Sequence, residues 1–273
     1  MKLLSLLADY LWPCHCEICS SPLSPLDGDP LRDAYGVVCG NCNPFSTLGF
    51  QYPLCTLYPR SFCRACGESS PHSLEEGLCP ACRAFPLPLR ELRTLVDYDE
   101  NAEVLIKRLK YELRHRIAPF LAHAMYNAIA GDTIFSSPNW NLLLPLPSCA
   151  TAVKKRGFSH TALMARHLAR KLGNDYSPFA LHSRGTRPSQ TELPRELRAS
   201  NVKGAFIASS KRIADKSILL IDDVVTTASS LSSAAMALMA AGAKSVDAIA
   251  IARSKQLAQN RIAVRLNTRV PKR

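Results

Sequence analysis

The stretch ILLIDDVVTTASS, residues 218–230, contains one complete structural unit of this 273-residue chain. Its first four residues form an apolar run, and the two β-branched isoleucines in that run favour a buried strand. The Ala-rich run at 231–241 favours a helix that ends at Gly242. The sequence therefore predicts a strand, a polar loop and a helix in succession.

Polar side chains fill the loop between these two elements. Asp222 and Asp223 follow the apolar run, so we expect them at the carboxyl end of the strand, where open α/β sheets bind ligands. Carboxylates accept hydrogen bonds from sugar hydroxyls, either directly or through Mg²⁺. Backbone N–H groups and hydroxyls at a helix N-terminus favour a phosphate, and this loop offers hydroxyls at Thr226, Thr227, Ser229 and Ser230.

The same stretch resembles the signature of the type I phosphoribosyltransferases, which bind 5-phosphoribosyl 1-pyrophosphate with Mg²⁺. The resemblance runs over all of 218–230, with one departure at Ala228, where most relatives have Gly. It implies that Asp222 and Asp223 are catalytic and hold the ribose, and that 226–230, Ala228 included, hold the 5-phosphate. The alternative is a Rossmann-like strand with solvated carboxylates and an ordinary Ser/Thr helix cap.

Length and composition predict one large core with a smaller appendage, because 47% of the residues are hydrophobic. No segment is long enough to span a membrane. The opening residues 1–13 hold Asp9 and lead straight into cysteine pairs, so we expect no signal peptide and no membrane insertion. We therefore expect a cytoplasmic protein.

The net charge of +12 is unevenly placed along the chain. Residues 1–86 carry 5 basic and 8 acidic side chains, which leaves 29 basic against 14 acidic side chains in the remainder. This excess predicts polyanionic ligands or nucleic acid as partners, with general solubility as the alternative.

Four Cys-x-x-Cys pairs near the N-terminus predict two zinc sites. Two residues between thiolates let both sulfurs face one ion, and two such turns complete a tetrahedral site with no open position, so the zinc is expected to be structural. We expect the first four and the last four cysteines to form one site each, with a cross-braced pairing and a disulfide framework as alternatives. The eight ligands are Cys16, Cys19, Cys39, Cys42, Cys63, Cys66, Cys79 and Cys82.

The other cysteines and the histidines are not among the eight expected ligands of these two zinc sites. Cys14 lies close enough to Cys16 to compete as a ligand, and core packing is expected for Cys55 and Cys149. The seven histidines show no metal-ligand spacing, so no role is assigned to them. The segment 23–59 has little periodic pattern, so we expect a core made largely by the metal, which unfolds when zinc is removed.

A Pro-Leu-Pro break at 86–88 starts a more basic and helical part of the chain. We expect one or two amphipathic helices over 101–130, with Pro119 opening or interrupting the second. Its basic residues are expected on a solvated face, with Lys110 as a candidate for a ligand cleft. The other elements expected are strands at 92–98, 142–146 and 246–252 and a helix at 161–172.

Three basic segments suit a polyphosphate. Lys154, Lys155 and Arg156 fall in an expected loop at 148–158, where fixed cations would stabilise a departing pyrophosphate, although such a cluster is usually a plain surface loop. The segment 184–206 is expected to be a lid that carries Gln190 and Arg198, or else an ordinary connection. The tail at 254–273 has six basic and no acidic residues, which fits a disordered end or a nucleic-acid contact.

The order of these features resembles the ComF family of competence-associated, phosphoribosyltransferase-like bacterial proteins. The resemblance covers 10–253 and rests on the cysteine pairs, Pro145-Leu146-Pro147, Arg156-Gly157-Phe158, Gln190 with Arg198 and Asn201, and the stretch 218–230. Ser159 and His160 depart from the Asn and Gln usual in the family. It implies an α/β fold with a twisted parallel sheet flanked by helices, a small hood and an N-terminal double zinc ribbon. With the break at 86–88 and the basic tail, we expect three parts: a double zinc ribbon at 1–86, a phosphoribosyltransferase-like domain at 87–253 and a basic tail at 254–273.

Three functions are compatible with these features. An enzyme would transfer ribose 5-phosphate to a nitrogen nucleophile with loss of pyrophosphate, by positioning and electrostatics and without a protein nucleophile. A binding module would hold single-stranded DNA or a nucleotide without turnover, which suits the link of the ComF family to DNA uptake in natural transformation and to other competence proteins. An adaptor would use the slightly acidic zinc ribbon to bind a protein partner.

Overall fold

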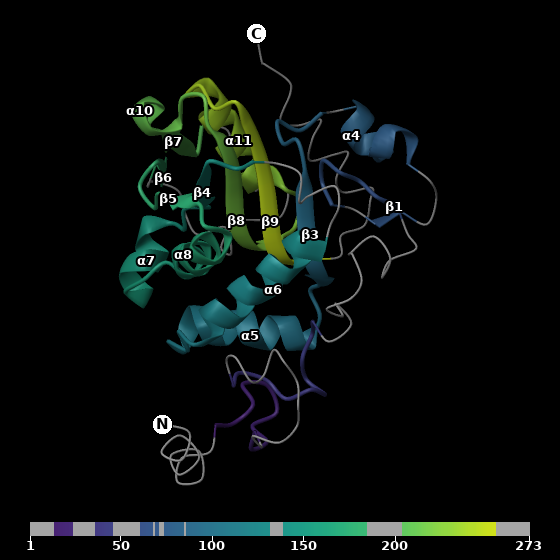
Figure 1. Ribbon diagram of the computed structural model, residues 1–273, viewed down its shortest axis with the longest axis vertical. Helices are drawn as coiled ribbons and strands as arrows, with labels where there is room; N and C mark the ends of the chain where they lie inside the picture. The colour runs from purple at the N-terminus through teal and green to yellow at the C-terminus, as the bar shows by residue number, and fades with distance from the viewer. Residues whose placement is uncertain are drawn as a thin grey trace.

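The computed structural model describes residues 14–23, 36–45, 61–67, 69–70, 74–84, 86–131, 139–184 and 204–254 (Figure 1). Two short strands, a 3₁₀ turn and one short helix precede residue 86: β1 (Ser61–Phe62), β2 (Ser69–Ser70), η1 (Glu75–Gly77) and α4 (Pro80–Ala84). The remaining described elements are β3 (Leu92–Asp97), α5 (Glu100–Tyr111), α6 (Ile117–Gly131), β4 (Leu142–Pro145), α7 (Ala150–Arg156), α8 (His160–Leu172), β5 (Asp175–Tyr176), β6 (Leu181–Ser183), β7 (Phe206–Ala208), α10 (Ser210–Ile213), β8 (Ser217–Val225), α11 (Ser229–Ala240) and β9 (Ser245–Arg253).

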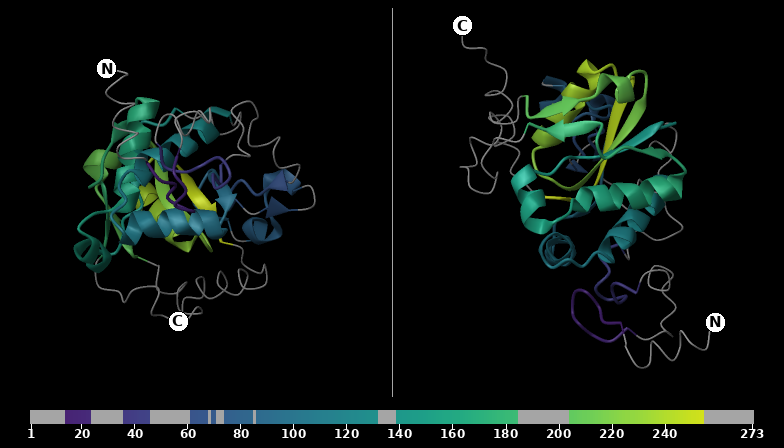
Figure 2. Two further views of the ribbon diagram at one scale, coloured as in Figure 1. Left: turned by 90° about the horizontal axis from the view of Figure 1, so that it is seen from below. Right: turned by 90° about the vertical axis from the view of Figure 1, so that its left-hand side faces the viewer.

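Five parallel strands form the central sheet, in the order β3-β9-β8-β4-β5. Helices lie on both sides of it (Figures 1 and 2). The four strands expected from the sequence are present, and so is the helix that ends before Gly242. The predicted α/β class, a parallel sheet flanked by helices, is confirmed.

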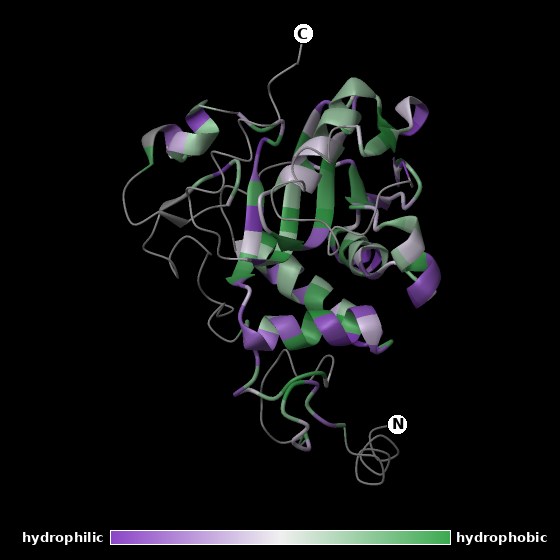
Figure 3. Cartoon of the chain, turned by 180° about the vertical axis from the view of Figure 1, so that it is seen from behind, coloured by the Kyte–Doolittle hydropathy of each residue, from purple (hydrophilic) through white to green (hydrophobic). Residues whose placement is uncertain are grey.

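The apolar run that starts β8 is continuous because both faces of the sheet are covered. Ile218 and Leu220 pack in the layer that contains α11, whereas Leu219 and Ile221 pack in the layer that contains α5, α6 and α8. All four side chains are fully buried. Strands covered on both faces lose the alternation of apolar and polar residues, as the mostly green central strands illustrate (Figure 3).

Strand β8 is longer than the sequence predicted. The expected end was Ile221, but pairing with β9 continues to Val225, which lies opposite Arg253. The pairing with β4, in contrast, stops where Pro145 lies opposite Ile221. The acid pair therefore lies on the strand itself, beside β9 and beyond the end of β4, because backbone pairing outweighs the low strand propensity of aspartate.

The helical predictions are confirmed in part. Residues 101–130 form two helices, and Pro119 lies in the first turn of α6, where its missing N–H costs nothing. The expected loop at 148–158 is wrong, because 150–156 form helix α7, which ends at Gly157 in the left-handed conformation with φ 80°. Its three cations thus occupy the last turn of a helix, where they complement the helix dipole.

Residues 36–45 belong to the main hydrophobic core and pack against helices α5 and α6. Val37, Val38 and Phe45 are buried together with α5 and α6, and the rings of Phe45 and Phe120 lie 5.6 Å apart. The expectation that the metal makes most of the core of 23–59 is therefore wrong for these residues, whose apolar contacts were hidden by the lack of a period. Further along the chain, the Leu92 N–H donates to the Arg64 carbonyl (2.7 Å) and joins 61–67 to the edge strand β3.

Several predictions fall outside the described residues or stay predictions. The expected lid, with Gln190 and Arg198, the residue Cys55 and the tail from 255 lie outside them. The domain boundaries at 86 and 253 remain predictions. Among the described helices, none is both long and apolar enough to cross a membrane.

Asp247 provides a test of how the sheet is anchored at its amino end. Its side chain is fully buried in β9 and accepts from Arg90 Nε (3.0 Å) and from Trp140 Nε1 (2.8 Å). We expect Asp247→Asn to lower the free energy of unfolding by about 2–3 kcal/mol, because it removes the charge that pairs with Arg90. Urea unfolding measures this, with Asp175→Asn as the control, since that carboxylate is 78% exposed. Equal stability of both variants would contradict the assignment.

Candidate functional site

The acid pair lies where the connections of the sheet diverge. Strand β8 continues through α11 to β9 on one side, whereas β4 continues through α7 and α8 to β5 on the other. Such a switch point, at the carboxyl ends of parallel strands, is where open α/β sheets bind ligands. Because side chains alternate along a strand, Asp222 lies on the α11 side and Asp223 on the side of α5 and α8.

Two side chains from different helices hold Asp223. His160 Nε2 lies 3.0 Å from Asp223 Oδ1, and the ammonium group of Lys110 pairs with Asp223 Oδ2. Lys110 comes from the last turn of α5, and His160 is the first residue of α8. The Thr161 hydroxyl donates to the Leu146 carbonyl (2.9 Å) and fixes the start of α8 beside the end of β4.

These contacts divide the charge of the pair unequally. Burial alone would raise the pKa of Asp223, but the Lys110 charge and the His160 hydrogen bond together hold it well below its usual value. Burial lowers the pKa of His160, so the neutral ring donates from Nε2 to the ionised Asp223. The His160 Nδ1 is then a buried acceptor, with no hydrogen-bond partner among the described residues.

Asp222 has the opposite character. Burial, followed by the negative charge of Asp223, raises its pKa well above the usual value. Its Oδ1 accepts from the backbone N–H of Asp223 (2.9 Å), and 9% of the residue is exposed. The site thus contains one carboxylate that is fixed in the ionised state and one that favours its proton.

The loop after β8 has the form of an anion site. Ala228 precedes α11 in the left-handed conformation, with φ 59°, which a residue with a Cβ adopts at a cost of about 1 kcal/mol. This is the backbone conformation for which Gly would be the usual choice. Thr227 Oγ1 lies 2.6 Å from Ser229 Oγ, and the Ser229 N–H points to Thr227 Oγ1 (3.4 Å). Small hydroxyl residues therefore surround the N-terminus of a twelve-residue helix.

The structure brings only part of the expected pyrophosphate side near the acid pair. Lys154 and Lys155 are exposed on α7. Arg156 donates to the Ala152 carbonyl (3.1 Å) and lies near enough to His160 for its charge to contribute to lowering the pKa of that histidine. Arg156 thus lies near the acid pair, and the sequence wrongly placed all three cations in a loop.

Lys110 and His160 show what the sequence revealed and what it hid. Lys110 was a candidate for a ligand cleft, and it does contact the acid pair. His160 was given no role, and that prediction was wrong, because the ring contacts Asp223. The available signal was its position at the start of the helix that follows strand 142–146, but only the neighbourhood of β4 and β8 gives that position meaning.

The eight paired cysteines form two groups in sequential order. In each group, Cys16, Cys19, Cys39 and Cys42 or Cys63, Cys66, Cys79 and Cys82, all four sulfurs lie within 4.8 Å of one another. The Cys19 and Cys39 sulfurs are 3.8 Å apart, as are those of Cys66 and Cys79. Tetrahedral zinc with Zn–S bonds of about 2.3 Å separates its sulfurs by about 3.8 Å, so both groups fit this ion and neither distance fits a disulfide.

The two remaining described cysteines stay outside these groups. Cys14 lies beside the first group but is not part of it. Cys149 does not pack in the core as expected, because it precedes α7 and its Sγ lies 3.0 Å from Thr151 Oγ1. That hydrogen bond lowers the pKa of the Cys149 thiol.

Comparison with known proteins first gives a class. Residues 153–269 match the model of the family described as "Phosphoribosyl transferase domain". The matched segment contains α8, β8, the loop at 226–230 and β9, which build the acid pair and its surroundings. Over these residues the chain is thus similar to a phosphoribosyl transferase domain, and its fold is of the α/β class with a parallel sheet flanked by helices.

Curated relatives then give a more particular likeness. The chain is 26% identical over 233 residues to "DNA utilization protein YhgH" of Escherichia coli O157:H7, which covers 80% of this chain and 97% of the relative. It is 28% identical over 200 residues to the protein of the same name from Salmonella typhimurium, with 71% and 85% covered.

Two solved structures overlap with the chain in part. A glutamine phosphoribosylpyrophosphate amidotransferase from B. subtilis shows a TM-score of 0.31 and 17% identity, covering 48% of this chain and 24% of that one. The chain thus spans about a quarter of the amidotransferase. Adenine phosphoribosyltransferase from Saccharomyces cerevisiae shows a TM-score of 0.35 and 14% identity, covering 54% and 73%.

The unequal acid pair predicts a pH-dependent stability. Since the folded pKa of Asp222 is raised, its stabilising contribution is lost as pH rises through that pKa, and Asp222→Asn avoids the loss. We expect Asp222→Asn to raise the free energy of unfolding, measured in urea, by at least about 1 kcal/mol at pH 8. The gain at pH 5.5 should be smaller.

Asp223→Asn is the matched control for this prediction. Its depressed folded pKa contributes stability that is complete above the unfolded pKa of about 4. Asp223→Asn should therefore be destabilised at both pH 5.5 and pH 8, and less at pH 8, because it also removes the charge that raises the pKa of Asp222. A pH-independent effect of Asp222→Asn would contradict the assignment.

Proposed function

We propose that the protein binds 5-phosphoribosyl 1-pyrophosphate with Mg²⁺ at the end of β8. One observation carries this proposal: a buried acid pair at the switch point of the sheet leads directly into a hydroxyl-rich loop at the N-terminus of α11. The match of this segment to the phosphoribosyl transferase domain supports it.

Each part of the site has a separate task in this proposal. Asp222, on the α11 side, accepts a hydrogen bond from a ribose hydroxyl, because both oxygens of Asp223 already contact Lys110 and His160. Asp223 instead fixes those two groups beside the ribose. Residues Thr226, Thr227, Ala228, Ser229 and Ser230 enclose the 5-phosphate with backbone N–H groups and hydroxyls.

Transfer of the ribose would then proceed by positioning and electrostatics. The bond between C1 and the pyrophosphate breaks as a nitrogen nucleophile attacks, and positive charge develops on the ring, next to the ionised Asp223. Arg156, with Lys154 and Lys155, supplies positive potential on the pyrophosphate side. Mg²⁺, when bound, neutralises charge on the pyrophosphate. Gln190 and Arg198 are proposed to contribute from the segment that precedes β7.

We also propose that both cysteine groups hold structural Zn²⁺. Four thiolates leave no open coordination position, so neither ion would take part in the chemistry. Both groups lie against the α/β domain, the first beside α5 and α6 and the second beside β3. Metal binding would therefore stabilise the elements that carry the site.

The zinc proposal is tested by metal analysis of the purified full-length protein. We expect two zinc ions per chain and loss of one in Cys63→Ser, with a lowered midpoint of unfolding because a ligand is missing. Cys149→Ser is the matched control, since this cysteine lies outside both groups, and it should keep two ions. Equal zinc content in the two variants would rule out the second site.

The ligand proposal is tested by calorimetric titration with 5-phosphoribosyl 1-pyrophosphate and Mg²⁺. We expect binding by the parent protein and a loss of affinity of about tenfold or more in Asp222→Asn, because an amide replaces one of the two acceptor oxygens by a donor and offers the ribose hydroxyl only a neutral acceptor. Asp175→Asn, at an exposed carboxylate on β5, should bind as the parent does.

A second candidate is a module that binds single-stranded DNA. The name of the relatives, "DNA utilization protein YhgH", and the basic charge of the chain after residue 86 favour it. Its signature in the same titration would be no binding of the phosphoribosyl ligand by folded parent protein, together with binding of an oligonucleotide that weakens steeply with salt. That pair of results would replace the first proposal with the second.

A further inference from the structure

Glu17 is a buried carboxylate in the middle of the first cysteine group. It lies between Cys16 and Cys19, and 4% of it is exposed. Its backbone N–H donates to the Val37 carbonyl (2.8 Å), which ties the two halves of the group together. No part of the proposed transfer chemistry uses this side chain, yet burial of an unpaired carboxylate would be costly.

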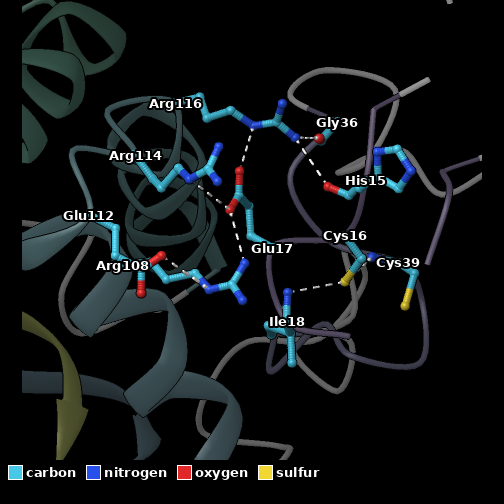
Figure 4. A network of polar contacts seen from close by, with 10 residues as sticks. All are labelled: His15, Cys16, Glu17, Ile18, Gly36, Cys39, Arg108, Glu112, Arg114 and Arg116. Carbon is cyan, nitrogen blue, oxygen red and sulfur yellow. Dashed lines mark hydrogen bonds and ion pairs between the residues drawn. The ribbon is translucent and has the colours of Figure 1, made fainter. Parts of the chain in front are cut away.

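Three arginines from the end of α5 and the following turn surround Glu17 (Figure 4). Arg116 Nε lies 3.1 Å from Oε1, while Arg108 Nη1 and Arg114 Nε lie 3.4 Å and 3.9 Å from Oε2. Arg116 also donates to the carbonyls of His15 and Gly36. The contact therefore joins both cysteine pairs of the first group to one helix end.

The arginines around Glu17 carry more positive charge than Glu17 offsets, and a negative cysteine group would complement this excess. Three guanidinium groups face one buried carboxylate, and Glu112, the second acid near Arg108, is 53% exposed at 3.8 Å. Four thiolates around a divalent ion carry a net charge of two minus. Such a group beside Glu17 complements the arginines, which makes this contact an electrostatic anchor.

The anchored turn has a strained backbone. Leu113 adopts φ 57°, which is unfavourable for a leucine, and its side chain is exposed, so its own packing does not compensate. Strained residues persist where their neighbours hold them. Here the neighbours are Arg114 and Arg116, which both contact Glu17.

Helix α5 connects this anchor to the acid pair. Arg108 and Lys110 are two residues apart, and a helix with 3.6 residues per turn points them about 200° apart. One side of the helix end therefore faces the cysteine group, and the other reaches Asp223. Figures 1 and 2 show α5 between the first cysteine group and the rest of the α/β domain.

We propose that Glu17 is a positioning residue for Lys110. By holding the arginines at the end of α5, it fixes the helix in the position in which the Lys110 ammonium group pairs with Asp223. The first cysteine group thus controls the charge environment of the acid pair without contacting it. This inference stands on the observed contacts and does not require that the ligand is 5-phosphoribosyl 1-pyrophosphate.

The accessibility of the Lys110 amine tests the proposal directly. Full-length, metal-loaded protein is treated with acetic anhydride, and the acetylation rate of each lysine is measured by peptide mass spectrometry. Glu17→Gln should acetylate Lys110 about tenfold faster, because the ion pair opens more often. Lys107, which lies three residues earlier in α5 and is 59% exposed, serves as the internal reference, and its acetylation rate should not change.

Further variants separate positioning from a general loss of structure. Arg116→Gln breaks the same contact but leaves the sequence between Cys16 and Cys19 intact. It should therefore also raise the acetylation rate of Lys110, with the metal content unchanged. Glu112→Gln, which neutralises an exposed acid on the same side of α5, should leave the Lys110 rate as in the parent. Glu17→Asp restores the carboxylate and should return the rate towards that of the parent.

Two outcomes would overturn the proposal. One is a parent-like Lys110 rate in both Glu17→Gln and Arg116→Gln. The other is a Glu17→Asp variant as reactive as Glu17→Gln, which would assign the effect to packing rather than to charge. Neither outcome depends on ligand binding, so a failure here is distinct from a failure of the proposed function.

Discussion

The ionised carboxylate of Asp223 is buried in the centre of the sheet, and its two partners determine how the surrounding elements are arranged. Removing a carboxylate from water costs several kcal/mol unless charge and hydrogen bonds replace the solvent. Lys110 and His160 supply both, but they come from helices that are far apart in sequence. The end of α5 and the start of α8 must therefore meet at β8, and the position of each helix depends on this one group.

The other carboxyl group of the pair, that of Asp222, has no such partners in the part of the chain that the structure describes, and it differs in its pKa. Burial, and then the charge of Asp223, keeps the pKa of Asp222 raised, and this side chain lies on the side of the helix whose N-terminus follows the hydroxyl loop. A site that holds a costly charge in a fixed place before the ligand arrives is preorganised, and its instability is tolerated where function requires it. The left-handed Ala228 is a second local cost at the same place.

The sequence predicts the elements of the α/β sheet well because both faces of each inner strand are covered, which turns strands into apolar runs. It underestimates β8, because two aspartates resemble a strand end, whereas pairing with β9 carries the strand on to Val225. It misses α7, whose three cations resemble a loop. His160 escapes because its meaning depends on which strands are neighbours, and no local pattern reports that. The cysteine groups are visible from spacing alone, but Val37 and Phe45 show no period that reveals their burial against α6.

The second cysteine group lies against β3, the longer of the two edge strands of the sheet. Of the two sheet edges, β5 is short at two residues, whereas β3 has six residues and would offer a row of unpaired backbone groups. The Arg64 carbonyl accepts from Leu92, and Gly67, with φ 69°, lies so close that an added Cβ would come within 3.4 Å of the Leu92 carbonyl oxygen. The second group thus acts as a cover for an exposed edge. Loss of the zinc proposed for this group would do more than loosen a small appendage, since it would uncover a strand able to pair with a second molecule and so begin aggregation.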